Sequence, residues 1–168
     1  MALMGNSWFS SRQSAGVLAY QHQVLEFLDG SGVASLHEVT VKGKTNFNGT
    51  FKATASKFGS DVSVNGAVSA IKSVFNANVW INGALTAVDS NFEGQVSIAT
   101  EQVTLKHSTI TKDLIVRQSS CLQQVVTLSK GSMIKGSVIF EMPNGKIKLL
   151  DGSKILGSIQ GAVKEEGA

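Results

Sequence analysis

The most constraining feature of the chain is an internal repeat of seventeen residues. Three consecutive segments align without a gap: TNFNGTFKATASKFGSD from Thr45, VSVNGAVSAIKSVFNAN from Val62 and VWINGALTAVDSNFEGQ from Val79. Four columns are identical in all three copies: Asn48, Asn65 and Asn82; Gly49, Gly66 and Gly83; Ser56, Ser73 and Ser90; and Phe58, Phe75 and Phe92. A repeat of this length is typical of solenoids, in which each unit buries its apolar face only against its neighbours.

Less regular copies follow the three matched ones. A fourth begins at Val96 and a fifth at Leu114, and both have lost the Asn-Gly pair. A related unit then recurs at an offset of 21 residues, in which Val126, Leu128, Gly131, Ser132, Ile134, Gly136, Ser137 and Val138 reappear as Ile147, Leu149, Gly152, Ser153, Ile155, Gly157, Ser158 and Ile159. The repeat is expected to run from about Val39 to about Val163, as about seven coils.

The pattern inside one unit predicts short strands. Apolar residues alternate at Val62 and Val64 and again at Val68 and Ala70, and the Asn-Gly between them suits a turn with positive φ. Strands this short need neighbours above and below, so we predict an all-β, single-stranded right-handed parallel β-helix of about 17–24 residues per coil. The competing left-handed hexapeptide helix needs an aliphatic residue at every sixth position, which the paired pattern fits poorly.

The 168 residues allow one domain, expected over residues 14–163. Residues 14–30 carry apolar residues at helical spacings before Asp29 and Gly30, which predicts a helix capping the first coil; an irregular strand coil is the alternative. Residues 1–13 and 164–168 are expected to be flexible tails.

The composition argues against several classes of protein. Hydrophobic residues make up 42% and charged residues 16%, so the chain is not intrinsically disordered, and no apolar run is long enough for a transmembrane helix. The single cysteine, Cys121, excludes an internal disulfide and a thiolate metal site. The net charge of +3 comes from dispersed lysines near the C-terminus without interleaved aromatic residues, which argues against nucleic-acid binding.

The recurring polar and aromatic columns have structural explanations. Stacked asparagines hydrogen-bond along a solenoid, and stacked phenylalanines fill its interior, which predicts two structural ladders: Asn48, Asn65 and Asn82, and Phe58, Phe75 and Phe92.

Charged residues give no clear catalytic or metal pattern. Lys72, Asp89 and Lys106 are expected at one repeat position as a surface charge ladder, with a catalytic Lys/Asp pair as the alternative. The three histidines, His22, His37 and His107, share no metal-ligand spacing. We therefore expect a non-enzymatic protein without cofactor, metal or catalytic residues.

One outward column is unusually apolar. It holds Trp80, Ile115 and Ile139 where solvent-facing residues are expected, and such a stripe indicates a contact surface. Either the N-terminal segment or another chain would cover it. A β-helix also ends in unpaired backbone groups, so we expect Ile155 and Ile159 in the last coil to carry end contacts in a homo-oligomer or filament.

The pattern Gly-Ser-x-Ile-x-Gly-Ser-Val in Gly131–Val138, repeated with a final isoleucine from Gly152 to Ile159, resembles the bactofilins, as do the seventeen-residue units. The resemblance covers about residues 39–163 and implies a bacterial, polymer-forming cytoskeletal protein that needs no nucleotide. It further implies a cytoplasmic scaffold for cell-envelope proteins, held at the inner face of the membrane through residues 1–9. Pro143 within the repeat and the longer units depart from the family pattern.

A second hypothesis is an exported β-helix module, periplasmic or on the cell surface, that acts as an adhesin or contacts carbohydrate. Outward faces rich in Ser and Thr and the low charge suit it. No signal peptide is visible in the sequence, so this hypothesis requires one that is no longer part of the chain.

Overall fold

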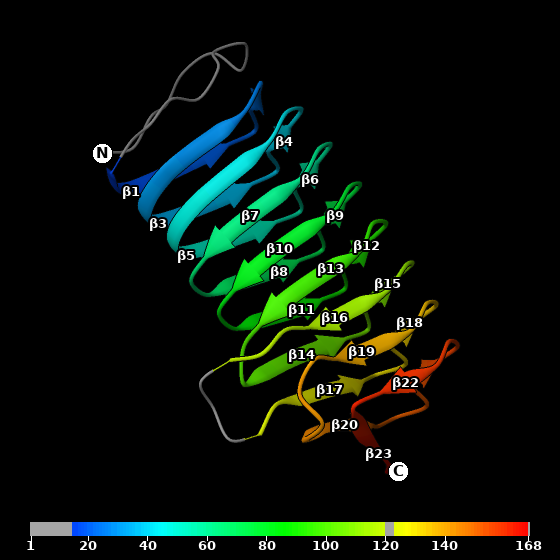
Figure 1. The fold of residues 1–168 in the computed structure, drawn as a ribbon. Helices are drawn as coiled ribbons and strands as arrows, with labels where there is room; N and C mark the ends of the chain where they lie inside the picture. Colours follow the sequence, from blue (N-terminus) through cyan, green and yellow to red (C-terminus); the bar gives the residue numbers. More distant parts are fainter. Residues whose placement is uncertain (1–14, 120–122, 168) are drawn as a thin grey trace.

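The computed structural model describes residues 15–119 and 123–167, and all regular structure in these two segments is β-strand. The strands are parallel and form a solenoid of about nine coils, with β1 (Ala15–Gln21) and β23 (Ala162–Glu166) at opposite ends of the stack (Figure 1). The predicted parallel β-helix is therefore confirmed, with more coils than the seven expected. Its right-handed sense stays a prediction, in line with the strong preference of parallel crossovers.

Two sheets form three faces along the solenoid. The third face is an eight-stranded sheet of β2 (Val24–Leu25), β4 (Thr40–Val41), β6 (Lys57–Phe58), β9 (Val74–Phe75), β12 (Asn91–Phe92), β15 (Thr109–Ile110), β18 (Met133–Ile134) and β21 (Lys154–Ile155). The other two faces belong to one 15-stranded sheet, because β3 (Leu28–His37) and β5 (Thr45–Thr54) run through the bend between them.

The first face continues from β5 as β7 (Val62–Asn65), β10 (Val79–Asn82), β13 (Val96–Ala99), β16 (Leu114–Val116), β19 (Val138–Phe140) and β22 (Ile159–Gln160). The second face continues as β8 (Val68–Ile71), β11 (Leu85–Val88), β14 (Gln102–Lys106), β17 (Val125–Ser129), β20 (Gly145–Leu149) and β23. At the other end, β1 pairs with the second half of β3.

The register confirms the alignment of the repeats. Cα partners on the first face follow one inward column through Thr45, Val62, Val79, Val96, Leu114, Val138 and Ile159. These positions are spaced by 17, 17, 17, 18, 24 and 21 residues, so the variable unit lengths are absorbed by the connections between strands.

The expected capping helix over residues 14–30 is wrong. The segment forms β1, β2 and the start of β3, so the solenoid begins well before Val39. Leu18 and Tyr20 are buried while Val17 is 54% exposed, which is the alternation of a strand. The apolar spacing was compatible with a helix, but pairing with β3 supplies a complete hydrogen-bond ladder, and tertiary pairing overrides local propensity.

The C-terminal boundary also differs from expectation. Lys164, Glu165 and Glu166, expected in a tail, belong to β23 and pair with β20. The expected N-terminal tail 1–13 and the proposed membrane contact of residues 1–9 lie outside the described residues, as do Cys121 and Ala168. Among the residues that the structure describes, no helix is long and apolar enough to cross a membrane.

Two rows of turns with positive φ shape each coil. Between the first and second faces the chain bends at Gly32, Gly49, Gly66 and Gly83, with φ from 107° to 146°. Between the second and third faces, one residue per coil adopts the left-handed region with φ near 50°, and none of these is glycine: His22, Glu38, Ala55, Lys72, Asp89, His107, Lys130 and Asp151. We call this second series the turn row. It places eight side chains above one another on the surface.

Candidate functional site

In residues 15–119 and 123–167, the interior columns end at the coil of β21, β22 and β23, and no further coil covers them. On the third face the column of Phe58, Phe75 and Phe92 continues through Ile110 and Ile134 to Ile155. Ile134 is fully buried, whereas Ile155 is only partly buried, and on the first face Ile159 is partly buried where Val138 before it is fully buried. Ile155 and Ile159, which were predicted to carry end contacts, are thus the last residues of two core columns.

The last coil also has an unpaired backbone edge. Within the described residues, β21, β22 and β23 each pair with a strand on one side only. Leu156 and Val163 add apolar surface here, being 59% and 67% exposed. An apolar strand edge of this kind can accept another strand layer.

Charged side chains occupy the second face of the same coil. Lys164 and Glu166 pair in register with the buried residues Ile147 and Leu149, so they stand at the core-facing positions of β23. Glu165 points the other way, and its Oε2 lies 2.8 Å from Lys146 Nζ; the hydrogen bond from Lys146 lowers the pKa of Glu165. Charges at core-facing positions oppose indiscriminate strand addition at an edge. The core-facing positions of the last coil are therefore apolar on the first and third faces and charged on the second.

The outward column of the first face follows the predicted register. Trp80 pairs with Ser97, Ser97 with Ile115, and Ile115 with Ile139. Trp80 is 40% exposed, and the two isoleucines are half-buried neighbours on β16 and β19. Ser97 interrupts the apolar stripe, which leaves the two isoleucines as one continuous patch and Trp80 apart from it.

Arg117, a residue of the same chain, covers part of this stripe. Its guanidinium carbon lies 4.1 Å from the centre of the Trp80 ring, and its Nε donates a 2.8 Å hydrogen bond to Ser97 Oγ. Nη2 donates to the Ile81 carbonyl at 2.8 Å. Burial lowers the pKa of Arg117, an effect that nearby Glu141 opposes. The cover over Trp80 is thus a residue of the fifth repeat, which sequence analysis did not single out.

The asparagine column forms the predicted ladder. Asn65 Nδ2 donates to Asn48 Oδ1 at 2.8 Å, and Asn82 Nδ2 donates to Asn65 Oδ1 at 2.9 Å. Arg117 Nη1 donates to Asn82 Oδ1 at 3.0 Å and so ends the series. The fourth repeat has lost its asparagine, and the arginine supplies the missing donor.

The phenylalanine column is also confirmed as core. The rings of Phe58 and Phe75 stack with centres 4.7 Å apart and planes at 7°, and those of Phe75 and Phe92 do the same at 5°. The spacing equals that between neighbouring strands, so the rings stack in step with the coils.

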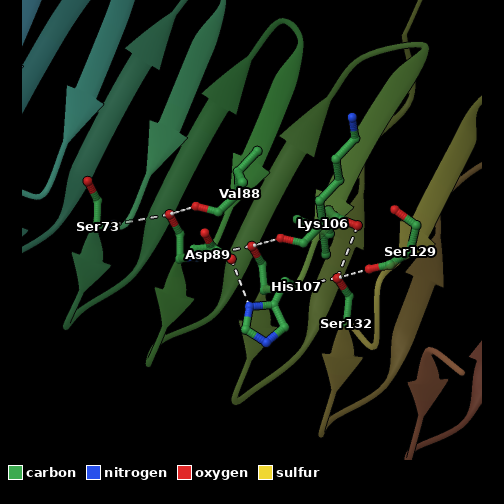
Figure 2. Close-up of polar contacts among 10 residues, drawn as sticks. Ser73, Val88, Asp89, Lys106, His107, Ser129 and Ser132 are labelled. Atoms are coloured by element: carbon green, nitrogen blue, oxygen red, sulfur yellow. Dashed lines mark hydrogen bonds and ion pairs between the residues drawn. The ribbon is translucent and has the colours of Figure 1, made fainter. Parts of the chain in front are cut away.

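A buried serine ladder, whose role was missed in the sequence, lies beside the turn row. In each coil from Ser56 to Ser153, the serine Oγ accepts a backbone N–H of the coil before it, at 3.0–3.2 Å. The serines are Ser56, Ser73, Ser90, Ser108, Ser132 and Ser153. The hydroxyl also donates back to the end of the preceding strand, for example from Ser132 to the Ser129 carbonyl at 2.8 Å (Figure 2). The conserved spacing of Ser56, Ser73 and Ser90 was the available signal.

We expect Ser90→Ala to lower the free energy of unfolding by about 1–3 kcal/mol, because it leaves the buried N–H of Ser73 without an acceptor. Denaturant or thermal unfolding followed by circular dichroism measures the change. Ser69→Ala, which removes the same group from the outer side of β8, is the control and should have a much smaller effect. Equal losses in the two variants would argue against the ladder.

The expected charge ladder needs correction by one residue. Lys106 pairs with Val88 on the strand, and it is His107 that follows Lys72 and Asp89 in the turn row. The fourth repeat is one residue longer, which displaced the alignment. His107 Nδ1 lies 2.7 Å from Asp89 Oδ1, and a dashed line in Figure 2 marks this contact. Lys72 precedes Asp89 in the turn row.

This pair lines a shallow hollow with Asn91, Thr109 and Gly131. The His107 and Asp89 side chains are 72% and 40% exposed, so their attraction is screened by solvent. A histidine–carboxylate pair resembles part of a general acid–base site, yet the hollow adds only amide and hydroxyl groups and Lys72 to it. The arrangement supports a surface charge pair better than a reaction centre.

Comparison with models of protein families, with curated proteins and with solved structures found no match for this chain.

Proposed function

We propose that the protein is a non-enzymatic structural protein whose solenoids associate end to end, as a bactofilin-like scaffold. The observation that carries this proposal is the incomplete burial of Ile155 and Ile159, the last members of core columns that are buried in every inner coil. A second copy placed on this end would complete both columns and pair the free edges of β21 and β22.

The charged face of the last coil gives this contact selectivity. Lys164 Nζ lies 3.9 Å from Glu166 Oε2, so a partner surface must accommodate this ion pair at core-facing positions, which favours one docking geometry over others. Trp80, Ile115 and Ile139 are proposed to add lateral contacts between solenoids. A cytoplasmic position near the membrane and cell-envelope partners belong to the same proposal.

The test is electron microscopy and sedimentation of the purified protein over a range of salt and protein concentration. We expect assemblies of the unaltered chain, and we expect Ile159→Lys to abolish them because it buries an unpaired charge in the contact. Gln160→Lys is the matched control, since it adds the same charge to the same strand at an exposed, outward position, and it should still assemble.

Circular dichroism of both variants establishes that they fold. A chain that stays monomeric under all conditions would overturn the proposal, and the exported carbohydrate-contacting module would then be tested by glycan binding at the Trp80 face. Equal assembly of the two variants would place the contact elsewhere than at the last coil.

A further inference from the structure

Two of the three histidines meet a glutamate on the surface of the first two coils. His22 Nδ1 lies 2.7 Å from Glu38 Oε2, and His37 Nε2 lies 3.8 Å from the same oxygen. One donor atom from each residue falls within 4.8 Å of the others, the only such group of metal-ligand types in residues 15–119 and 123–167. The two imidazole rings stand nearly perpendicular, with centres 5.7 Å apart.

The solenoid brings these residues together. His22 and Glu38 occupy the turn row in consecutive coils, with φ of 53° and 55°, and His37 is the last residue of β3. The backbone N–H of His22 donates to the His37 carbonyl at 3.0 Å, and that of Glu38 donates to the Thr54 carbonyl at 2.9 Å. The backbone positions of all three ligands are therefore held by the ladder between coils, while their side chains stay free to adjust.

We propose that His22, His37 and Glu38 bind a divalent metal ion of the zinc class and thereby tie the first coil to the second. Two imidazoles and one carboxylate are a ligand set that suits Zn²⁺, with water in the fourth position. Hard ions such as Mg²⁺ and Ca²⁺ prefer oxygen ligands throughout, so they should bind poorly. This inference departs from the sequence expectation of no metal site, and it does not depend on the proposed self-assembly.

Metal-bound donor atoms lie roughly 3.4 Å apart in a tetrahedral site. In the structure, the donor atoms of the three side chains lie between 2.7 and 4.8 Å from one another. The side chains of His22, His37 and Glu38 are 65%, 50% and 48% exposed, so small rotations can bring their donor atoms to this spacing without disturbing the core. The ion would replace the direct contact between His22 and Glu38.

The ion would have a structural consequence because its ligands come from both coils. Within the described residues β1 pairs only with β3 and β2 only with β4, so the first coil has a neighbour on one side. A ligand that binds only the closed state lowers the population of the open state by the factor 1 + [L]/Kd, which is about tenfold at a free concentration ten times Kd. Zn²⁺ should therefore protect the backbone amides of β1 and β2 from hydrogen exchange.

The turn row contains its own control. Asp89 and His107 repeat the contact of Glu38 and His22, with Nδ1 and Oδ1 again 2.7 Å apart. The positions preceding them are Val88 and Lys106, so this second pair lacks a third ligand and has a cation beside it. It should not hold the ion.

The experiment is calorimetric titration of Zn²⁺ into the untagged chain carrying Cys121→Ser, which removes the single thiol. We expect one site per chain, at least about tenfold weaker binding in His37→Ala, and unchanged binding in His107→Ala. Mg²⁺ serves as the hard-ion comparison. Hydrogen exchange with and without Zn²⁺ should show slower exchange in β1 and β2 of the unaltered chain and no change in His37→Ala.

Absence of binding, or equal affinity in His37→Ala and the unaltered chain, would overturn the proposal. Protection spread over all coils instead of the first two would also contradict it. The exposed position of His37 leaves the core intact in the variant, and its circular dichroism spectrum checks this.

Discussion

Gly66→Ala, which adds one methyl group at a bend between stacked coils, is expected to destabilise the protein strongly. Gly66 has φ of +143°, and a Cβ there would lie 2.0 Å from the Gly49 carbonyl oxygen and 2.7 Å from its carbon. Both atoms belong to the backbone of the coil below and cannot rotate away. Strain and overpacking together should cost roughly 3 kcal/mol or more in free energy of unfolding, and the melting temperature should fall by ~6–12 °C.

Gly131→Ala is the matched control for this prediction. Gly131 also has positive φ, at +74°, but nothing lies within 4 Å of the added Cβ. The free energy of unfolding of this variant should fall by only roughly 1–2 kcal/mol, which is what the left-handed conformation costs an L-residue. Thermal unfolding of the two variants separates the contribution of contact between coils from that of backbone conformation. Similar losses in both would mean that the stacked bends do not pack as tightly as described.

The second large effect is expected from Phe75→Ala. Phe75 is almost fully buried, and its ring stacks on Phe58 on one side and Phe92 on the other at 4.7 Å. Removing it loses the buried apolar surface and leaves a cavity between two rings that the backbone ladder holds apart. We expect the free energy of unfolding to fall by about 3–5 kcal/mol, measured by denaturant unfolding.

Phe27→Ala controls for the chemical change itself. Phe27 is 39% exposed and lies outside the stack, so the same substitution should cost much less. Phe75→Leu should fall between the two variants, because leucine refills part of the volume. A loss in Phe27→Ala equal to that in Phe75→Ala would contradict the assignment of the stack as the centre of the core.

The two ladders that were predicted share a property that makes them visible in a sequence. Asn48, Asn65 and Asn82 lie seventeen residues apart, as do the three phenylalanines, and each contact joins neighbouring coils. In a solenoid, a fixed spacing along the chain becomes a fixed spacing in space. Contacts within one column can therefore be read directly from the alignment of repeats.

Contacts that skip a coil could not be read this way. Arg117 reaches Asn82 over 35 residues, one 17-residue unit plus one 18-residue unit, so it stands two coils further along the asparagine column and spans Ala99 between them. The His22–Glu38 contact follows a sixteen-residue coil that carries neither the Asn-Gly pair nor the phenylalanine used to align the others. Their placement depends on the length of particular coils and on which side chain is long enough to reach across.

The sequence by itself determined the class of fold, the register of the inner coils and the identity of their core columns, because the period of the repeat and the alternation of apolar residues are local properties of the chain. Only the tertiary structure decided the ends. The first coils became strands instead of a helix because β3 offered pairing, and Ile155 and Ile159 stayed partly exposed because no strand of the described residues pairs on the far side of the last coil. A terminal coil has one neighbour where an inner coil has two, so its structure depends on contacts that no repeat encodes.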